Sequence, residues 1–189
     1  MDIIPQILYD DRRNEFFPLI VEEMRRQKIV KYNLVSPILA NDVVTSINVS
    51  QKEIIKKAKE RGEKEVCIME HDIWFPSETG WKYFLENKPN EFDIYLGGTY
   101  LIDNSSVQYV SPVTKVNSYV GHHCIIVHEK YYDRFLETPD DTHIDTAQSG
   151  KGEFYLCYPM PALQRPGFSM NNKTLVDYNK ILEKKHIYE

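Results

Sequence analysis

Two acidic residues and a histidine interrupt a hydrophobic stretch of the sequence. Glu70, His71 and Asp72 follow the apolar run 66–69, and apolar residues resume at Ile73. Side chains two residues apart in an extended segment point the same way, so Glu70 and Asp72 can share one target. Carboxylate oxygens suit Mg²⁺ or Mn²⁺, and a nearby imidazole favours Mn²⁺. The spacing indicates a cation site; the alternative is that Asp72 only caps a turn while Glu70 is solvated.

The elements that must position these acids alternate along the chain. Short apolar bursts are separated by amphipathic stretches, a pattern typical of a layered α/β fold. The predicted strands are 3–8, 32–36, 66–69, 92–98, 124–128 and 153–159, and the predicted helices are 13–28, 50–62, 79–87, 129–137 and 174–185. The run 66–69 suits a central strand buried on both faces. Ligands of open α/β sheets bind beyond the carboxyl ends of the strands, where Glu70 and Asp72 would stand.

Local signals set some of the predicted helix boundaries. Ser50 and Glu53 have the spacing of a capping box, and Gly62 is a typical residue just past a helix end. These residues predict a helix that starts at position 50. Pro18 comes early enough in the helix 13–28 to be tolerated there.

Length and composition narrow the class of protein. The chain has 189 residues, which favours one domain, and its net charge of -5 is spread along it, which argues against a nucleic-acid partner. No apolar run approaches the roughly 20 residues of a membrane span, and the first residues lack the layout of a secretion signal. Cys67, Cys124 and Cys157 each lie in an apolar run. They are expected to be buried free thiols of a cytoplasmic protein.

Six blocks of the sequence occur in the order of a known family. The acidic segment CIMEHDIWFP is followed by EFDIYLGG at 91–98. This resembles glycosyltransferase family 25, the lipopolysaccharide-type and collagen-type galactosyl- and glucosyltransferases, in which a hydrophobic strand ends in Glu-Asp-Asp. Further similar blocks are 9–24, 45–72, 121–136, 143–149 and 158–172. Two positions depart from the family pattern: His71 replaces the middle acid, and Gln51 stands where the family has a histidine after serine.

The resemblance implies a fold and a reaction. The expected fold is a single GT-A-like, Rossmann-like domain over 1–189, with a mixed central sheet flanked by helices. The expected reaction moves a hexose, galactose or glucose, from a UDP-sugar to a glycan or lipopolysaccharide-type acceptor. By the same resemblance the transfer is inverting and assisted by Mn²⁺ or Mg²⁺. The metal or other cations would offset the charge of the departing diphosphate, and a base would activate the acceptor hydroxyl.

The resemblance also assigns the residues of the acidic and acceptor sides. Asp72 is the expected principal metal ligand, and Glu70 is expected to contact the ribose or to lie close to the metal. Independently of the resemblance, His143 could coordinate the metal or bind the diphosphate, although a single loop histidine more often does neither. Asp145, which matches a family aspartate, is the expected catalytic base, with a helix N-cap as the alternative. His71 should point away from its two neighbours, and packing is favoured over metal binding.

Donor-binding candidates come from three other segments. Arg12 and Arg13 follow the first predicted strand, and a guanidinium can bind phosphate through its planar fork. The alternative for both is a solvated helix start. His123, Gln164 and Ser169 match a histidine, a glutamine and a serine of the family pattern.

Two other classes of function fit parts of the sequence. A metal-dependent phosphohydrolase or nucleotidyltransferase could use the same carboxylates, but such enzymes often need further acids to hold two metals. No extra acid is obvious near Asp72. A non-catalytic nucleotide- or carbohydrate-binding relative of the transferases would fit the small size and the absent histidine at position 51.

Overall fold

A seven-stranded mixed sheet forms the centre of the molecule. The computed structural model describes residues 3–102 and 108–189. The strand order is β2-β1-β3-β9-β5-β10-β7. The strands are β1 (Pro5–Leu8), β2 (Asn33–Val35), β3 (Glu65–Glu70), β5 (Ile94–Leu96), β7 (Val113–Val116), β9 (Cys124–His128) and β10 (Phe154–Cys157). β1 is parallel to β2 and β3, and β5 is parallel to β10, whereas β9 runs antiparallel to both β3 and β5. The predicted mixed α/β sheet is confirmed.

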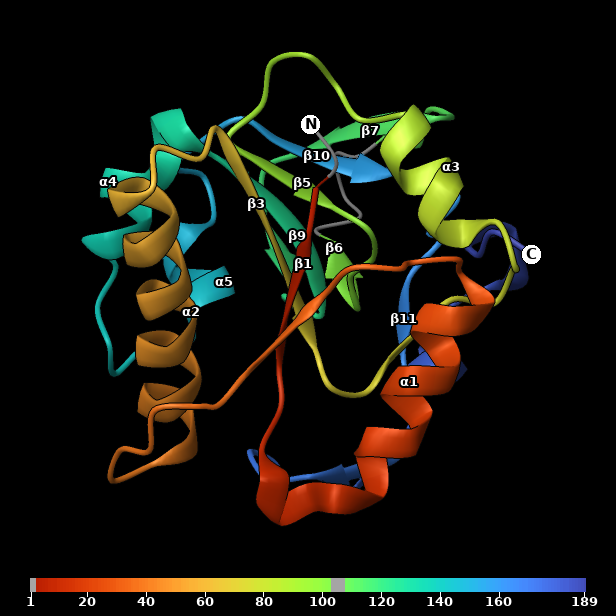
Figure 1. Cartoon of the computed structure of the whole chain (residues 1–189). Helices are drawn as coiled ribbons and strands as arrows, with labels where there is room; N and C mark the ends of the chain where they lie inside the picture. Colours follow the sequence, from red (N-terminus) through yellow and green to blue (C-terminus); the bar gives the residue numbers. More distant parts are fainter. Residues whose placement is uncertain (1–2, 103–107) are drawn as a thin grey trace.

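Helices cover both faces of this sheet. α2 (Val43–Glu60) and α4 (Tyr132–Leu136) lie on one face, and α1 (Phe17–Arg26) and α3 (Gly80–Glu86) lie on the other (Figure 1). Alternate side chains of β3 enter the two cores: Val66 and Ile68 pack on the α2 side, and Cys67 and Met69 pack on the α1 side. The prediction of a central strand buried on both faces is therefore confirmed for β3.

Smaller elements gather around the ends of the strands. They are β4 (Ile73–Trp74) with β11 (Leu163–Gln164), β6 (Leu101–Ile102) with β8 (Tyr119–Val120), the hairpin of β12 (Gly167–Ser169) and β13 (Thr174–Val176), α5 (Ile144–Gln148), and four short 3₁₀ turns, η1 (Asp11–Phe16), η2 (Glu129–Tyr131), η3 (Tyr178–Ile181) and η4 (Lys184–His186). All three cysteines are buried and free, as expected. Across the described residues, no helix has both the length and the apolar content needed to cross a bilayer.

The helix predicted from position 50 begins earlier. α2 starts at Val43, because Asp42 caps it and accepts a hydrogen bond from the Thr45 N–H at 2.8 Å. Ser50 is buried inside the helix, where its hydroxyl bonds the carbonyl of Ser46 and accepts from the Ile38 N–H. The Ser50–Glu53 spacing is therefore not a capping box. The predicted end is confirmed, since Gly62 follows the helix with φ of +66°.

Two other helix predictions need correction. The segment 174–185 contains β13, η3 and the start of η4 rather than a helix, because residues 174–176 pair with β12, which leaves Leu175 79% exposed. The first part of 13–28 is not α-helical either. Arg13 has non-helical angles within η1, and α1 begins at Phe17 with Pro18 in its first turn, where proline is tolerated.

Candidate functional site

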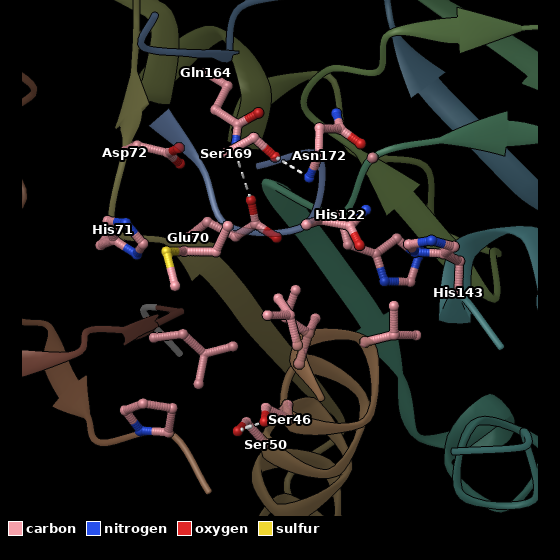
Figure 2. A pocket seen from close by; sticks show the side chains of 18 of the residues that line it. Ser46, Ser50, Glu70, His71, Asp72, His122, His143, Gln164, Ser169 and Asn172 are labelled. Carbon is pink, nitrogen blue, oxygen red and sulfur yellow. Dashed lines mark hydrogen bonds between the residues drawn. The ribbon is translucent and has the colours of Figure 1, made fainter. Parts of the chain in front are cut away.

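A cleft of about 800 Å³ lies beyond the carboxyl ends of β1 and β3. Its walls come from the first half of α2, the β8–β9 loop, α5 and the β11–β13 segment (Figure 2). The predicted site residues that line it are Arg12, Arg13, Glu70, Asp72, His143, Asp145, Gln164 and Ser169. Residues far apart in sequence are thus brought to one cleft, at the edge of the sheet where α/β folds bind ligands.

The acid pair forms one wall of this cleft. Glu70 is the last residue of β3, and its Oε2 accepts a hydrogen bond of 3.0 Å from the Gln164 side chain. Asp72 lies two residues later, and its Oδ1 is buried without a hydrogen-bond partner in the described structure. Burial raises the pKa of Glu70 well above its ordinary value, and the charges of Asp72 and Asp145 raise it further. Burial also raises the pKa of Asp72. These carboxyls are therefore prone to hold a proton until a cation or a donor group replaces it.

His71 lies between the two acids and packs against a ring. Its imidazole meets Phe16 edge-on, with ring centroids 4.5 Å apart. Burial lowers the pKa of His71 to about 4, so the ring is neutral near pH 7. The ring contact supports packing over metal binding for this residue.

Three arginines line the acidic side of the cleft. Arg12 is 62% exposed, and Asp10 already occupies its fork through contacts of 2.8 Å to Nε and 2.5 Å to Nη2. Arg13 lies over the Phe16 ring and bonds Glu15. Arg165, which the sequence did not single out, donates its backbone N–H to the Asp72 carbonyl at 2.8 Å.

Arg165 is held by a buried acid from α1. Its Nη2 contacts Glu23 Oε2 at 2.9 Å, while its Nε is buried without a partner in the described structure. The positive charges of Arg13 and Arg165 both favour the ionised form of Asp72. An anionic ligand beside Asp72 would meet these two guanidinium groups rather than that of Arg12.

Asp145 is held by two backbone amides on the wall formed by α5. Its Oδ2 accepts from the Gly121 N–H at 2.7 Å, and its Oδ1 accepts from the Thr146 N–H at 2.6 Å. Gly121 has φ of +114°, a conformation that glycine adopts without strain. The N-cap position of α5 belongs to His143, so the capping alternative for Asp145 is wrong.

The adjacent histidines divide their contacts. His123 is 1% exposed, does not line the cleft, and lies 3.2 Å from the Ala162 carbonyl through Nε2. The backbone of Gly98 packs closely against Ala162 beside this histidine. A Cβ at position 98 would lie 1.9 Å from the Ala162 carbonyl oxygen, so only glycine fits there. His122 lines the cleft instead, with Nδ1 2.9 Å from Gln51 Oε1. The sequence could not decide which of two neighbouring imidazoles faces the cleft.

The metal ligand set differs from the prediction. His143 lies on the other side of Glu70 from Asp72 (Figure 2). Within 3–102 and 108–189, no three His, Cys, Asp or Glu side chains are grouped so that they could hold an ion. Glu70 and Asp72 alone fit a divalent cation, because the unpartnered Asp72 Oδ1 is a hard oxygen ligand. Phosphate oxygens and water would complete such a coordination sphere.

Comparison with known proteins gives a likeness of fold. Models of protein families and curated protein sequences show no match to this chain, so the resemblance to family 25 stays a prediction. Among solved structures, A197 from STIV has a TM-score of 0.53 at 13% identity, with 100% of this chain and 97% of that chain covered. The mannose-1-phosphate geranyltransferase from Thermus thermophilus has a TM-score of 0.50 at 7% identity, with 83% of this chain and 74% of that chain covered. A glycosyltransferase involved in glycosylation of the major capsid of PBCV-1 has a TM-score of 0.43 at 12% identity, with 71% of this chain and 64% of that chain covered. The chain thus has a mixed α/β fold similar to that of A197.

Proposed function

We propose that this protein is a metal-assisted, inverting glycosyltransferase that moves a hexose, galactose or glucose, from a UDP-sugar to a glycan or lipopolysaccharide-type acceptor. The observation that carries the proposal is the unpartnered Asp72 Oδ1 beside Glu70, flanked by Arg13 and Arg165 in the cleft. A volume of about 800 Å³ is large enough for a nucleotide sugar. The likeness of fold to a protein named as acting on mannose-1-phosphate also supports sugar-phosphate chemistry.

On the donor side, the residues would bind the negatively charged diphosphate. Asp72 and Glu70 would hold Mn²⁺ or Mg²⁺, which when bound offsets the charge of the leaving group. Arg13 and Arg165 would contact the phosphate oxygens. The buried Nε–H of Arg165 has no partner in the described structure, so it is available to donate to a phosphate. Gln164 fixes the orientation of Glu70 through its 3.0 Å hydrogen bond.

On the acceptor side, Asp145 would act as the base. The acceptor oxygen forms a bond to the anomeric carbon while the bond to the diphosphate oxygen breaks, and the hydroxyl proton passes to Asp145. Attack from the face opposite the leaving group inverts the anomeric centre. The Gly121 and Thr146 amides fix the carboxylate in one orientation.

We assign the reaction to one domain over 1–189 and to the cytoplasm. The three buried free thiols support a reducing compartment.

One observation favours the second candidate, a binding protein without turnover. Both oxygens of Asp145 already accept backbone hydrogen bonds, as they would in a purely structural role. A two-metal hydrolase or nucleotidyltransferase is less well supported. Such enzymes need more carboxylates, and no third acid joins the pair among the described residues.

The test combines ligand-induced thermal shifts with turnover. We expect UDP, UDP-galactose or UDP-glucose to raise the melting temperature more with Mn²⁺ than without it, because ligands that bind only the native state stabilise it. Asp72→Asn should remove the Mn²⁺-dependent part, and Glu60→Gln, an exposed helix position, should keep it. Asp145→Asn should keep the shift but release no UDP.

Two outcomes would contradict the transferase. A wild-type protein that binds a UDP-sugar but never transfers or hydrolyses it is a binding protein. A wild-type protein whose melting temperature no nucleotide changes, with or without Mn²⁺, has another ligand altogether.

A further inference from the structure

The side chain of Gln51 lies at the bottom of the cleft with half of its amide unused. Gln51 lines the cleft and has 0% exposure. Its Oε1 lies 2.9 Å from His122 Nδ1, whereas its Nε2 has no hydrogen-bond partner in the described structure. A buried amide group without a partner destabilises the protein, which makes it a place where a ligand group gains affinity.

The chemistry of the amide restricts the ligand group. An amide can be rotated so that its oxygen and nitrogen exchange places, but His122 pairs with one of the two atoms in either orientation. The remaining atom is a donor in one case and an acceptor in the other. A hydroxyl serves both cases, because it donates and accepts, whereas a carboxylate only accepts and an ammonium only donates.

The charges near Gln51 also disfavour an anionic ligand. Burial lowers the pKa of His122 to about 4, so the ring carries no positive charge near pH 7. Asp145 accepts from the Gly121 N–H, next to His122, so its charge would repel a carboxylate or a phosphate placed there. The arginines that line the cleft flank the acid pair rather than this wall.

The helix that carries Gln51 presents an apolar surface next to it. Val44, Ile47 and Gln51 are spaced by three and four residues, so they share one face of α2, and all three line the cleft. Val44 and Ile47 are half-buried, and Gln51 is deeper. A sugar ring has an apolar C–H face and hydroxyls at its edge, which matches this order of surfaces.

We propose that Gln51 determines acceptor specificity, and that the acceptor group bound there is an uncharged sugar. One of its hydroxyls bonds the Gln51 amide while its ring lies along Val44 and Ile47. This inference rests on the proposed transferase function and names the class of its second substrate. It also gives the cleft two regions, one with arginines for the donor and one without them for the acceptor.

The experiment measures binding of uncharged and charged sugars in the presence of UDP and Mn²⁺. The probes are lactose, methyl galactoside and glucuronate, and saturation-transfer NMR measures their binding. Hydrolysis of UDP-galactose in water is measured in parallel. We expect lactose or methyl galactoside to bind and glucuronate not to bind. Gln51→Met should lower the affinity for the uncharged sugar about tenfold, because one hydrogen bond is lost. The affinity for UDP-galactose should stay within twofold.

A second buried glutamine offers a matched control. Gln148 is 1% exposed and does not line the cleft, and both of its amide atoms have partners, Tyr119 and Thr138. Gln148→Met should therefore leave sugar binding unchanged. Should Gln51→Met fail to fold, Ile47→Glu tests the same surface at a half-buried position and is expected to abolish sugar binding.

The outcomes separate this inference from the proposed function. Sugar binding that is unchanged in Gln51→Met, preferred binding of glucuronate, or no binding of either uncharged sugar would overturn the Gln51 assignment. A UDP-sugar that is neither bound nor hydrolysed by the wild-type protein would instead overturn the transferase, whatever the sugars do.

Discussion

The acids at the end of β3 show how far residue types and spacing lead. Glu70 and Asp72 were predicted to act on one target, and both line the cleft. Arg165 and His122 were missed, because their contacts join distant segments: Arg165 beside β11 bonds Asp72, and His122 in the β8–β9 loop bonds Gln51 of α2. Position 51 stood out only as a departure from a family pattern. Short-range spacing predicts neighbours on one strand, whereas contacts between distant segments leave no local signal.

The raised pKa of Glu70 predicts an unusual dependence of stability on pH. A carboxyl that stays protonated in the folded protein above the ordinary value of about 4 binds more protons than in the unfolded chain. The free energy of unfolding therefore falls as pH rises through this range. We expect Glu70→Gln to match the wild type near pH 4 and to exceed it at neutral pH, by up to about 1.4 kcal/mol for each pH unit crossed.

Urea unfolding between pH 4 and pH 8 measures this difference. Glu60→Gln removes one negative charge from an exposed position of α2 and should follow the wild-type curve. A Glu70→Gln variant that becomes less stable than the wild type as pH rises would show that the ionised carboxylate is stabilised in the fold.

At the scale of elements, the boundaries that failed were those decided by tertiary contacts. α2 begins at Val43, capped by Asp42, whereas the equally plausible Ser50 lies inside the helix and accepts from the distant Ile38 N–H. The segment 174–185 has helical spacing, yet β13 pairs with β12 instead. Strands such as β3 and β9 were predictable because their continuous apolar runs have only one way to be buried.

α1 is tied to the cleft by one buried acid. Glu23 is 2% exposed, accepts from the Phe75 N–H at 3.1 Å, and contacts both Arg26 and Arg165. We expect Glu23→Gln to destabilise the protein by about 3 kcal/mol, because it leaves two partly buried arginines without their carboxylate. Donor affinity should fall as well, since Arg165 loses its support.

The neighbouring pair provides the control for this prediction. Glu22 and Arg25 have the same spacing, but their side chains are 59% and 72% exposed, so Glu22→Gln should cause no measurable change in urea unfolding. Equal effects of the two substitutions would mean that the Glu23 network contributes nothing beyond a surface pair.

At the scale of the whole molecule, stability and ligand contact reside in different parts. The central strands β3 and β9 are almost entirely buried, whereas the β12–β13 hairpin exposes Phe168 and Leu175 yet lines the cleft. We expect backbone amides of β9 to exchange with deuterium at least about a hundredfold more slowly than those of the hairpin. UDP with Mn²⁺ should slow exchange in the hairpin.

Hydrogen exchange followed by mass spectrometry tests this contrast. Exchange in β9 reports global unfolding and serves as the internal reference. A hairpin as protected as β9 before any ligand is added would show that the cleft wall is already part of the stable core.

The direction of β9 affects which segments can vary in sequence without disturbing the sheet. Because this strand runs against both neighbours, its beginning lies at the same rim of the sheet as the ends of β3 and β5. Segments that enter the sheet and segments that leave it therefore meet at the rim where the cleft lies. Lengthening the connection before Cys124 would reshape the mouth of the cleft from one direction, while the exits at Glu70 and Leu96 kept their places. Sequence change at that entry can alter what is bound without disturbing how the sheet is paired.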